Sequence, residues 1–125
     1  MDDQTRRELS RGHTIDITTT GRHTGKDRRI EIVFFNFGGR LYISGMPRAD
    51  RKRAWLLNLE TDPKLTLHLK GAHAVDLPAT ARIISDDEER RAVLALVARA
   101  WKRDDLDDMV RFSPLIEVTV DELAA

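Results

Sequence analysis

The alternation of apolar and polar residues within short segments is the feature of this sequence that most constrains its fold. It is clearest in KLTLHLK (64–70), where the three leucines would point inward and Thr66 and His68 would point outward. A period of two residues is that of a β-strand with one buried face, whereas an amphipathic helix repeats every 3.6 residues. We therefore predict a strand here, with His68 as a surface residue.

Five further segments have β character, because they are rich in β-branched or aromatic residues and turn residues separate them. The expected strands are 13–20, 28–37, 40–45, 64–70, 73–85 and 113–121. Gly38-Gly39 predicts a hairpin turn between the second and third of these strands. Pro78 predicts an interruption or a sheet edge within the fifth, because proline cannot donate a hydrogen bond to a neighbouring strand.

Helices are expected at 2–10 and 49–62 and, after a capping box in which Ser85 and Glu88 satisfy the first free amides, from Ser85 onward. An apolar stripe at helical spacing follows this cap and comprises Val93, Leu96, Val97, Ala100 and Trp101. DDLDDMVRF continues as a second helical piece. Together the elements predict one α+β domain over residues 1–125, built on a small barrel of about six mainly antiparallel strands with two or three helices.

The composition excludes several classes of protein. With no cysteine among 125 residues, the chain has no disulfide, no thiolate nucleophile and no cysteine metal site. Its four histidines lack a metal-binding spacing, so we expect no metal. No apolar run approaches the ~20 residues of a membrane-spanning helix, and MDDQTRRELSR at the N-terminus lacks the apolar region of a signal peptide. We therefore expect a cytoplasmic protein without an integral membrane segment.

The net charge is zero, but it is unevenly distributed. Residues 1–53 carry 12 Lys and Arg against 7 Asp and Glu, whereas residues 54–125 carry 9 against 14. A basic half indicates an anionic ligand, with mere solvation of a polar surface as the alternative. Nucleic acid is not the expected ligand, because the domain as a whole has no basic excess and few aromatic residues.

Two basic clusters lie in this half of the chain. The first, ITTTGRHTGKDRR (17–29), has only three residues between its glycines, and Asp27 stands where a nucleotide-binding P-loop needs Ser or Thr. Its glycines and cations nevertheless suit an anion, although an ordinary solvated hairpin would have a similar composition. The second cluster, PRADRKRAW (47–55), places cations at the expected start of a helix, where they oppose the helix dipole. An anion bound there would offset that cost.

The pattern resembles the deazaflavin (coenzyme F420)-dependent nitroreductase family, small split β-barrel oxidoreductases common in actinobacteria. Its most specific parts are T-T-G-R-x-T-G-x-x-R (19–28) and W-x-x-N-L-x-x-x-P (55–63), in the right order and at a suitable separation. The likeness extends over roughly residues 14–120. It implies a split β-barrel of the FMN-binding-like type.

The resemblance also implies a cofactor and its site. Coenzyme F420 is an 8-hydroxy-5-deazaflavin that carries a phosphate and an oligoglutamate tail, so it needs several cations. By resemblance, the phosphate and tail would be held by Arg22, Thr24, Gly25, Lys26 and Arg28, with Arg51 and Lys52 opposite them across a groove. Val33, Phe34 and Phe35 would pass beside the ring, and Ser44, Gly45 and Met46 would lie near its linker. Asn58 and Trp55 would support the site.

The implied activity is hydride transfer from the reduced cofactor to an electron-poor acceptor such as a quinone, enone or nitroarene. The family tends to place tyrosines in its C-terminal segment, whereas this chain has a single tyrosine, Tyr42, and offers Trp101, Met109 and Phe112 there instead. This substitution predicts an apolar acceptor pocket and hydrophobic acceptors. FMN is a less suitable cofactor, because its single phosphate needs fewer cations. A split-barrel binding protein for a lipid or another small ligand, without turnover, is the alternative, and the oligomeric state, a homodimer included, stays open.

Overall fold

The computed structural model describes residues 1–123, which form six β-strands and four α-helices. The strands are β1 (Thr14–Thr20), β2 (Asp27–Phe37), β3 (Arg40–Ser44), β4 (Lys64–Leu69), β5 (Val75–Ile83) and β6 (Leu115–Val120). The helices are α1 (Asp3–Leu9), α2 (Ala54–Thr61), α3 (Asp87–Trp101) and α4 (Leu106–Phe112), and a 3-10 turn follows at Asp121–Leu123. The expected α+β barrel fold is confirmed. The structure has four helices, whereas the sequence predicted two or three.

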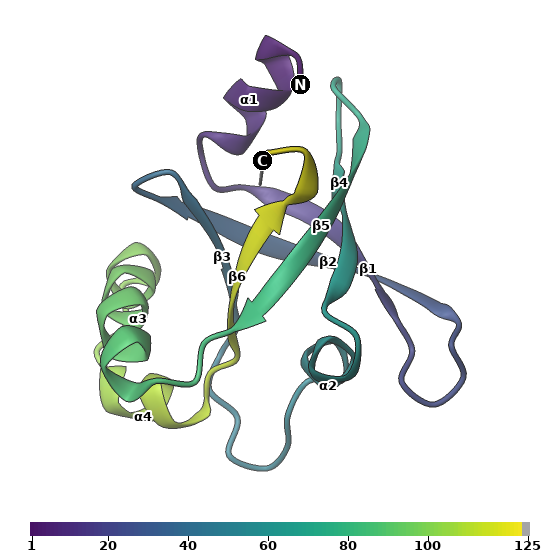
Figure 1. Cartoon of the computed structure of the whole chain (residues 1–125). Helices are drawn as coiled ribbons and strands as arrows, with labels where there is room; N and C mark the ends of the chain where they lie inside the picture. The colour runs from purple at the N-terminus through teal and green to yellow at the C-terminus, as the bar shows by residue number, and fades with distance from the viewer. Residues whose placement is uncertain (124–125) are drawn as a thin grey trace.

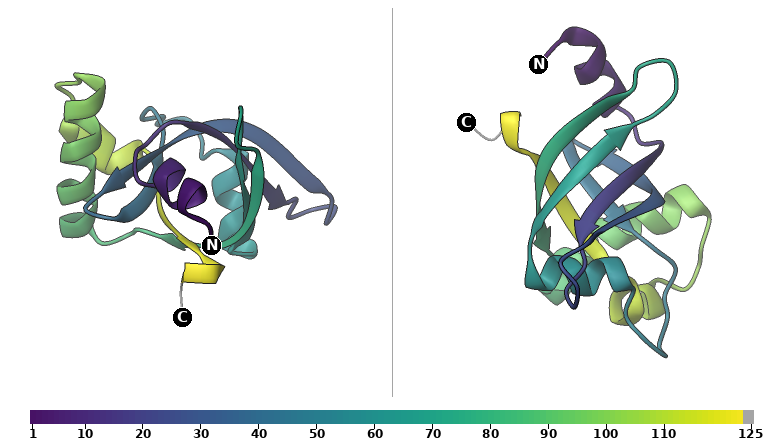
Figure 2. Two further views of the ribbon diagram at one scale, coloured as in Figure 1. Left: turned by 90° about the horizontal axis from the view of Figure 1, so that it is seen from above. Right: turned by 90° about the vertical axis from the view of Figure 1, so that its right-hand side faces the viewer.

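The six strands close into a barrel in the order β1-β2-β3-β6-β5-β4, and every neighbouring pair is antiparallel (Figures 1 and 2). The barrel closes where β1 pairs with β4, and Ile17 lies opposite Leu67 there. Gly38 and Gly39 both have positive φ and make the expected hairpin turn. β5 runs without interruption through Pro78, because its pairing with β6 begins only at the next residue.

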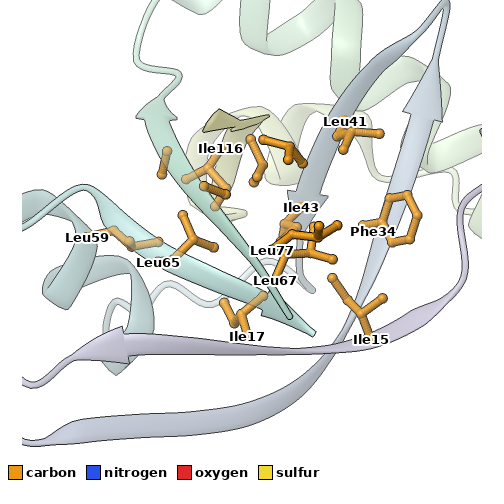
Figure 3. Packing of buried hydrophobic residues seen from close by; sticks show 14 of the residues in the cluster. Ile15, Ile17, Phe34, Leu41, Ile43, Leu59, Leu65, Leu67, Leu77 and Ile116 are labelled. Atoms are coloured by element: carbon orange, nitrogen blue, oxygen red, sulfur yellow. The ribbon is translucent and has the colours of Figure 1, made fainter. Parts of the chain in front are cut away.

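The inward faces of the strands fill the barrel with aliphatic and aromatic side chains (Figure 3). The side chains with no exposed surface are Ile15, Ile17, Phe34, Ile43, Leu67 and Ile116. α1 and α2 lie at opposite ends of the barrel (Figure 1), and they contribute Leu9 and Leu59 to the same core. Burial of these side chains, at roughly 1.5–3 kcal/mol each, is the main source of stability.

A second apolar cluster joins α3 and α4 to the outer side of the barrel. Phe35 and Tyr42 supply its barrel side, and Leu94, Val97 and Met109 supply its helix side. The expected stripe on α3 is partly wrong. Leu94 and Ala98 are buried, whereas Leu96 is 39% exposed and Ala100 also faces solvent. Both stripes keep helical spacing, so periodicity alone could not choose between them.

The ends of the helices correct two further expectations. Asp86, not Ser85, caps α3, because its side chain accepts a hydrogen bond from the backbone nitrogen of Glu89 at 2.9 Å. Lys102 then ends α3 in the left-handed conformation, which separates α4 as a helix of its own. α2 begins at Ala54, so the basic residues of 47–53 precede the helix in a loop. Within residues 1–123, no helix has the length and apolar character needed to cross a bilayer.

His68 is not the surface residue that its strand position predicts. It lies on the outer face of β4 but is only 6% exposed. Its Nε2 lies 2.6 Å from Oγ1 of Thr18, and its Nδ1 lies 2.7 Å from Oδ1 of Asp76. The hydrogen bond from His68 lowers the pKa of Asp76. Side chains of the two flanking strands therefore cover the imidazole on the outside of the barrel.

Candidate functional site

The loop between β1 and β2 has a compact backbone that depends on its two glycines. The backbone nitrogen of Gly21 donates to the carbonyl of Lys26, and that of Gly25 donates to the carbonyl of Gly21, both at 2.8 Å. A Cβ added at Gly21 would lie 2.9 Å from the Lys26 carbonyl oxygen, and Gly25 has a φ of 70°. Both positions therefore favour glycine, one for space and the other for conformation.

Replacing Gly25 with valine is expected to destabilise the protein by about 1–2 kcal/mol, because a β-branched residue is strained at positive φ. Gly25→Asn should cost less, since asparagine tolerates this conformation. Gly71→Val is the matched control, because Gly71 has a φ of 87° in the turn between β4 and β5. Thermal unfolding should show similar losses for both valine variants, and an unchanged Tm for Gly25→Val would contradict the loop conformation.

The side chain of Asn58 in α2 anchors this loop through hydrogen bonds. Its Oδ1 accepts hydrogen bonds from the backbone nitrogen of Arg22 at 3.1 Å and from the Arg22 guanidinium at 3.0 Å. Its Nδ2 donates to Oγ1 of Thr19 at 3.1 Å, and the residue is 3% exposed. One buried amide therefore fixes the end of β1 and the first basic residue of the loop.

A cavity of about 300 Å³ opens between this loop and α2. Its lining includes Gly21, Arg22, Thr24, Arg28, Trp55 and Asn58. The basic side chains of the loop at Arg22, Lys26 and Arg28 are exposed, and within residues 1–123 none has a carboxylate within 4 Å. Cations without carboxylate partners beside an indole wall suit an anionic group attached to a ring.

A larger groove of about 740 Å³ lies on the opposite side of α2. Seven basic residues line it: Arg48, Arg51, Lys52, Arg53, Arg90, Arg91 and Arg111. The carboxylates in its lining are Glu60 and Asp87, and Glu60 already pairs with Lys52 at 3.0 Å. Asp50 and Asp107, which are outside the lining, pair with Arg48 and Arg91 at 3.0 Å, so the groove keeps a smaller positive excess.

The two cavities use opposite faces of one helix. Leu56 and Glu60 line the groove, whereas Trp55 and Asn58 line the loop cavity. At 100° per residue these pairs point in opposite directions from the axis of α2. The structure thus places Arg51 and Lys52 in a different cavity from Arg22 and Arg28, rather than opposite them across one groove.

The residues expected beside the cofactor ring do not line either cavity. Phe34 has no exposed surface and belongs to the barrel core, and Phe35 is buried against Trp101 of α3 at 5.4 Å between ring centroids. Val33 is 37% exposed. Alternation along β2 therefore points Phe34 into the barrel and its two neighbours outward. Of these neighbours, Phe35 is covered by α3, whereas Val33 is partly exposed.

The residues expected near the cofactor linker lie at the end of β3. Ser44 is buried and donates a hydrogen bond from Oγ to the carbonyl of Pro114 at 2.7 Å. Gly45 faces the Arg53 guanidinium, and a Cβ added there would lie 3.1 Å from it. Met46 is 51% exposed, and its sulfur lies 2.9 Å from the Arg103 guanidinium. Gly45 therefore leaves room for a cation of the groove.

Of the three residues expected to line an acceptor pocket, only Phe112 lines the groove. Its ring is partly exposed and carries the Arg111 guanidinium 5.1 Å from its centroid. Met109 has no exposed surface, and Trp101 packs edge-to-face on Phe35. The latter two residues therefore build the helix layer behind the groove.

Three cations of the groove were missed in the sequence: Arg90, Arg91 and Arg111. They belong to the half of the chain in which acidic residues predominate, so counting charge by halves concealed them. The fold brings the N-terminal part of α3 and the end of α4 beside the loop at 48–53, which no linear count of charge reveals.

Arg90 differs from the other groove cations because backbone carbonyls surround its guanidinium. It donates to Val110 at 2.9 Å, Ile84 at 3.0 Å, Met109 at 3.4 Å and Ser113 at 2.6 Å. Burial lowers its pKa. Arg90 therefore ties the end of α4 to the strand that leads into α3, and it shapes the wall of the groove.

The fold and these cavities define a class of protein: a small β-barrel with two cavities whose linings are partly basic and partly apolar. Residues 2–122 match the model of the F420H(2)-dependent quinone reductase family, and the chain belongs to this family. The resemblance found in the sequence is thus confirmed, and the protein is a coenzyme F420-dependent reductase.

Solved structures share the barrel at low sequence identity. An F420-H2 dependent reductase is 21% identical, with a TM-score of 0.63 over 85% of this chain and 93% of its own. The conserved hypothetical protein Rv2991 from Mycobacterium tuberculosis is 17% identical, with a TM-score of 0.69 over 97% and 81%. The heme storage protein HutZ from Vibrio cholerae is 14% identical, with a TM-score of 0.66 over 94% and 86%. These likenesses establish the fold.

Proposed function

We propose that this reductase holds the phosphate and glutamate tail of coenzyme F420 at the β1–β2 loop and reduces a flat quinone-type acceptor. The observation that supports this most is the loop cavity itself. Arg22 and Arg28, neither of which has a carboxylate partner among residues 1–123, line this cavity together with the apolar Trp55, and the exposed Lys26 belongs to the same loop. A polyanion attached to an aromatic ring matches both features.

The residues present fit this cofactor better than they fit FMN. A phosphate takes up one guanidinium fork, and each glutamate can engage a further cation. Arg22 and Arg28 would hold the phosphate, since both line the cavity, and the exposed Lys26 of the same loop would engage the tail. FMN, with one phosphate and no glutamates, would leave part of this charge unused, and we expect it to bind more weakly.

The reaction divides between cofactor and protein. When bound, the reduced deazaflavin supplies a hydride, which with one proton from water converts a quinone to a hydroquinone. The chain supplies orientation, because Asn58 fixes the loop that would hold the phosphate and tail. Hydride transfer requires contact between ring and acceptor, so a ring anchored at the loop would have to extend past α2 to the groove. The apolar floor of the groove, which includes Leu56, Ile84 and Leu115, suits the flat body of an acceptor.

Arg28→Lys tests the cofactor assignment. We expect it to weaken F420 binding by about tenfold, because a lysine cannot fork onto a phosphate, and to leave the Tm of the free protein nearly unchanged. Arg29→Lys is the matched control, because Arg29 points to the other face of β2 and pairs with Asp16 at 2.9 Å. Fluorescence titration at several salt concentrations measures both variants.

The results separate the candidate functions. Equal affinity of wild type and Arg28→Lys would remove the loop from the cofactor site. F420 affinity should also fall with salt, and it should fall less for a cofactor without glutamates, because salt screens exposed ion pairs. The alternative, a binding protein without turnover, would be supported if F420 bound but menadione did not oxidise its reduced form.

A further inference from the structure

We propose that the acceptor of this enzyme carries an acidic group: a flat quinone or related ring bearing a carboxylate or sulfonate, bound in the groove between α2, α3 and α4. This inference rests on the proposed function, since it assigns the acceptor class of the same enzyme. It differs from the purely apolar pocket that the sequence suggested. The groove, not a cluster of Trp101 and Met109, is the open cavity there.

The apolar residues of the groove would contact the flat ring system of the acceptor. The larger apolar residues of its lining are Leu56, Ile83, Ile84, Val110, Phe112, Pro114 and Leu115. A volume of about 740 Å³ is within the ~300–1,000 Å³ range of small-molecule sites. Such a floor binds the body of a ring system by burying its surface.

Arginines of the groove would bind the acidic group of the acceptor. Arg51, Arg53 and Arg111 line the groove, and within residues 1–123 none of the three has a carboxylate within 4 Å. Burial and the neighbouring charge of Arg48 lower the pKa of Arg53. An anion beside Arg53 would offset this cost of its charge, and a neutral quinone would not.

The hydroxyl of Ser113 lies behind the lining of the groove. The residue is 3% exposed, and its Oγ is buried and has no hydrogen-bond partner among the described residues. An unpaired buried hydroxyl costs free energy, but a ligand oxygen could reach this one only if the lining moved. The guanidinium groups of the groove therefore carry the inference.

The cofactor tail is the rival occupant of the groove. Its chemistry is also anionic, but the loop cavity on the other face of α2 already offers free cations for it. Binding of the acceptor and binding of the cofactor tail would depend on different arginines. An acidic acceptor would depend on Arg51 and Arg111, whereas a tail confined to the loop cavity would depend on Arg28.

Binding to the cofactor-free protein tests the proposal without turnover. Equilibrium dialysis would compare anthraquinone-2-sulfonate with the neutral 2-(hydroxymethyl)anthraquinone. We expect the sulfonate to bind at least about tenfold more tightly, the factor that one charge-assisted contact provides. The double variant Arg51→Gln/Arg111→Gln should remove most of this preference, and Arg28→Gln should leave it unchanged. Both arginines are exposed, so the variants are expected to fold.

A competition experiment distinguishes an acidic acceptor from the cofactor as the ligand of the groove. Continued binding of the sulfonate in the presence of saturating oxidised F420 would support the proposal. Displacement of the sulfonate by F420, or equal binding of the two anthraquinones, would overturn it. Neither result would affect the proposed function, which fails separately if F420 itself does not bind or Arg28→Lys leaves its affinity unchanged.

Discussion

Replacing Arg90 with leucine is expected to lower the free energy of unfolding by about 3 kcal/mol, the largest stability loss that we predict for a single groove residue. The guanidinium donates to four backbone carbonyls, and leucine would leave those in the interior without a partner, at ~1–3 kcal/mol for each carbonyl that water cannot reach. Thermal unfolding of the free protein should show a fall in Tm of roughly 10 °C.

Two variants make this result specific. Arg90→Lys should recover only part of the loss, because one ammonium group cannot span carbonyls on both the strand end and α4. Arg91→Leu is the matched control, since Arg91 is the next residue along the helix and pairs on the surface with Asp107 at 3.0 Å. Surface pairs contribute ~0–1 kcal/mol. Similar losses for Arg90→Leu and Arg91→Leu would contradict the role assigned to the buried guanidinium.

Replacing Asn58 with aspartate is expected to abolish most F420 binding while the fold is kept. An aspartate can still accept both hydrogen bonds from Arg22, and the Thr19 hydroxyl can turn to donate to it. The new negative charge, however, would face the phosphate in the same cavity. At ~5 Å and an effective dielectric constant of about 20, the repulsion is about 3 kcal/mol, or roughly a hundredfold in Kd.

Asn58→Leu provides the contrast. It removes the acceptor for Arg22 and the donor to Thr19, so the protein itself should lose about 2 kcal/mol of stability and the loop should lose its anchor. Tm and F420 affinity should therefore fall together for leucine, whereas affinity alone should fall for aspartate. If Asn58→Asp bound F420 as the wild type does, the phosphate would have to lie elsewhere.

The sequence was sufficient for the strands, because their period of two residues reflects the geometry of the barrel directly. It also predicted a loop between β1 and β2, although the conformational roles of Gly21 and Gly25 there emerge only from the structure. It was insufficient for His68, because alternation assigns a side chain to a face but does not reveal that Thr18 and Asp76 on neighbouring strands cover it.

The groove could not be predicted for a similar reason. Arg53 and Arg111 lie 58 positions apart, in halves of the chain with opposite net charge, and only the packing of α4 beside the loop at 48–53 brings them together. The partnership of Asn58 with Arg22 was also hidden, although the motifs contained both residues. Motif spacing identifies which residues matter, whereas their hydrogen bonds depend on how α2 packs beneath the loop.

Closure of the barrel bears on the behaviour of the protein at high concentration. A chain with zero net charge and an isoelectric point near 6.9 lacks the long-range repulsion that keeps many proteins apart at neutral pH. Open sheets are then at risk, because an unpaired edge strand is a template for another copy. Here each of the six strands has two neighbours in the barrel, but the long β2 pairs with β1 over residues 27–33 and with β3 only over residues 34–37. The second edge of residues 27–33 is therefore left unpaired. Closure thus protects most of the barrel, whereas the open edge of β2 carries Asp27, Arg28, Arg29 and Glu31, whose charges oppose pairing with another copy.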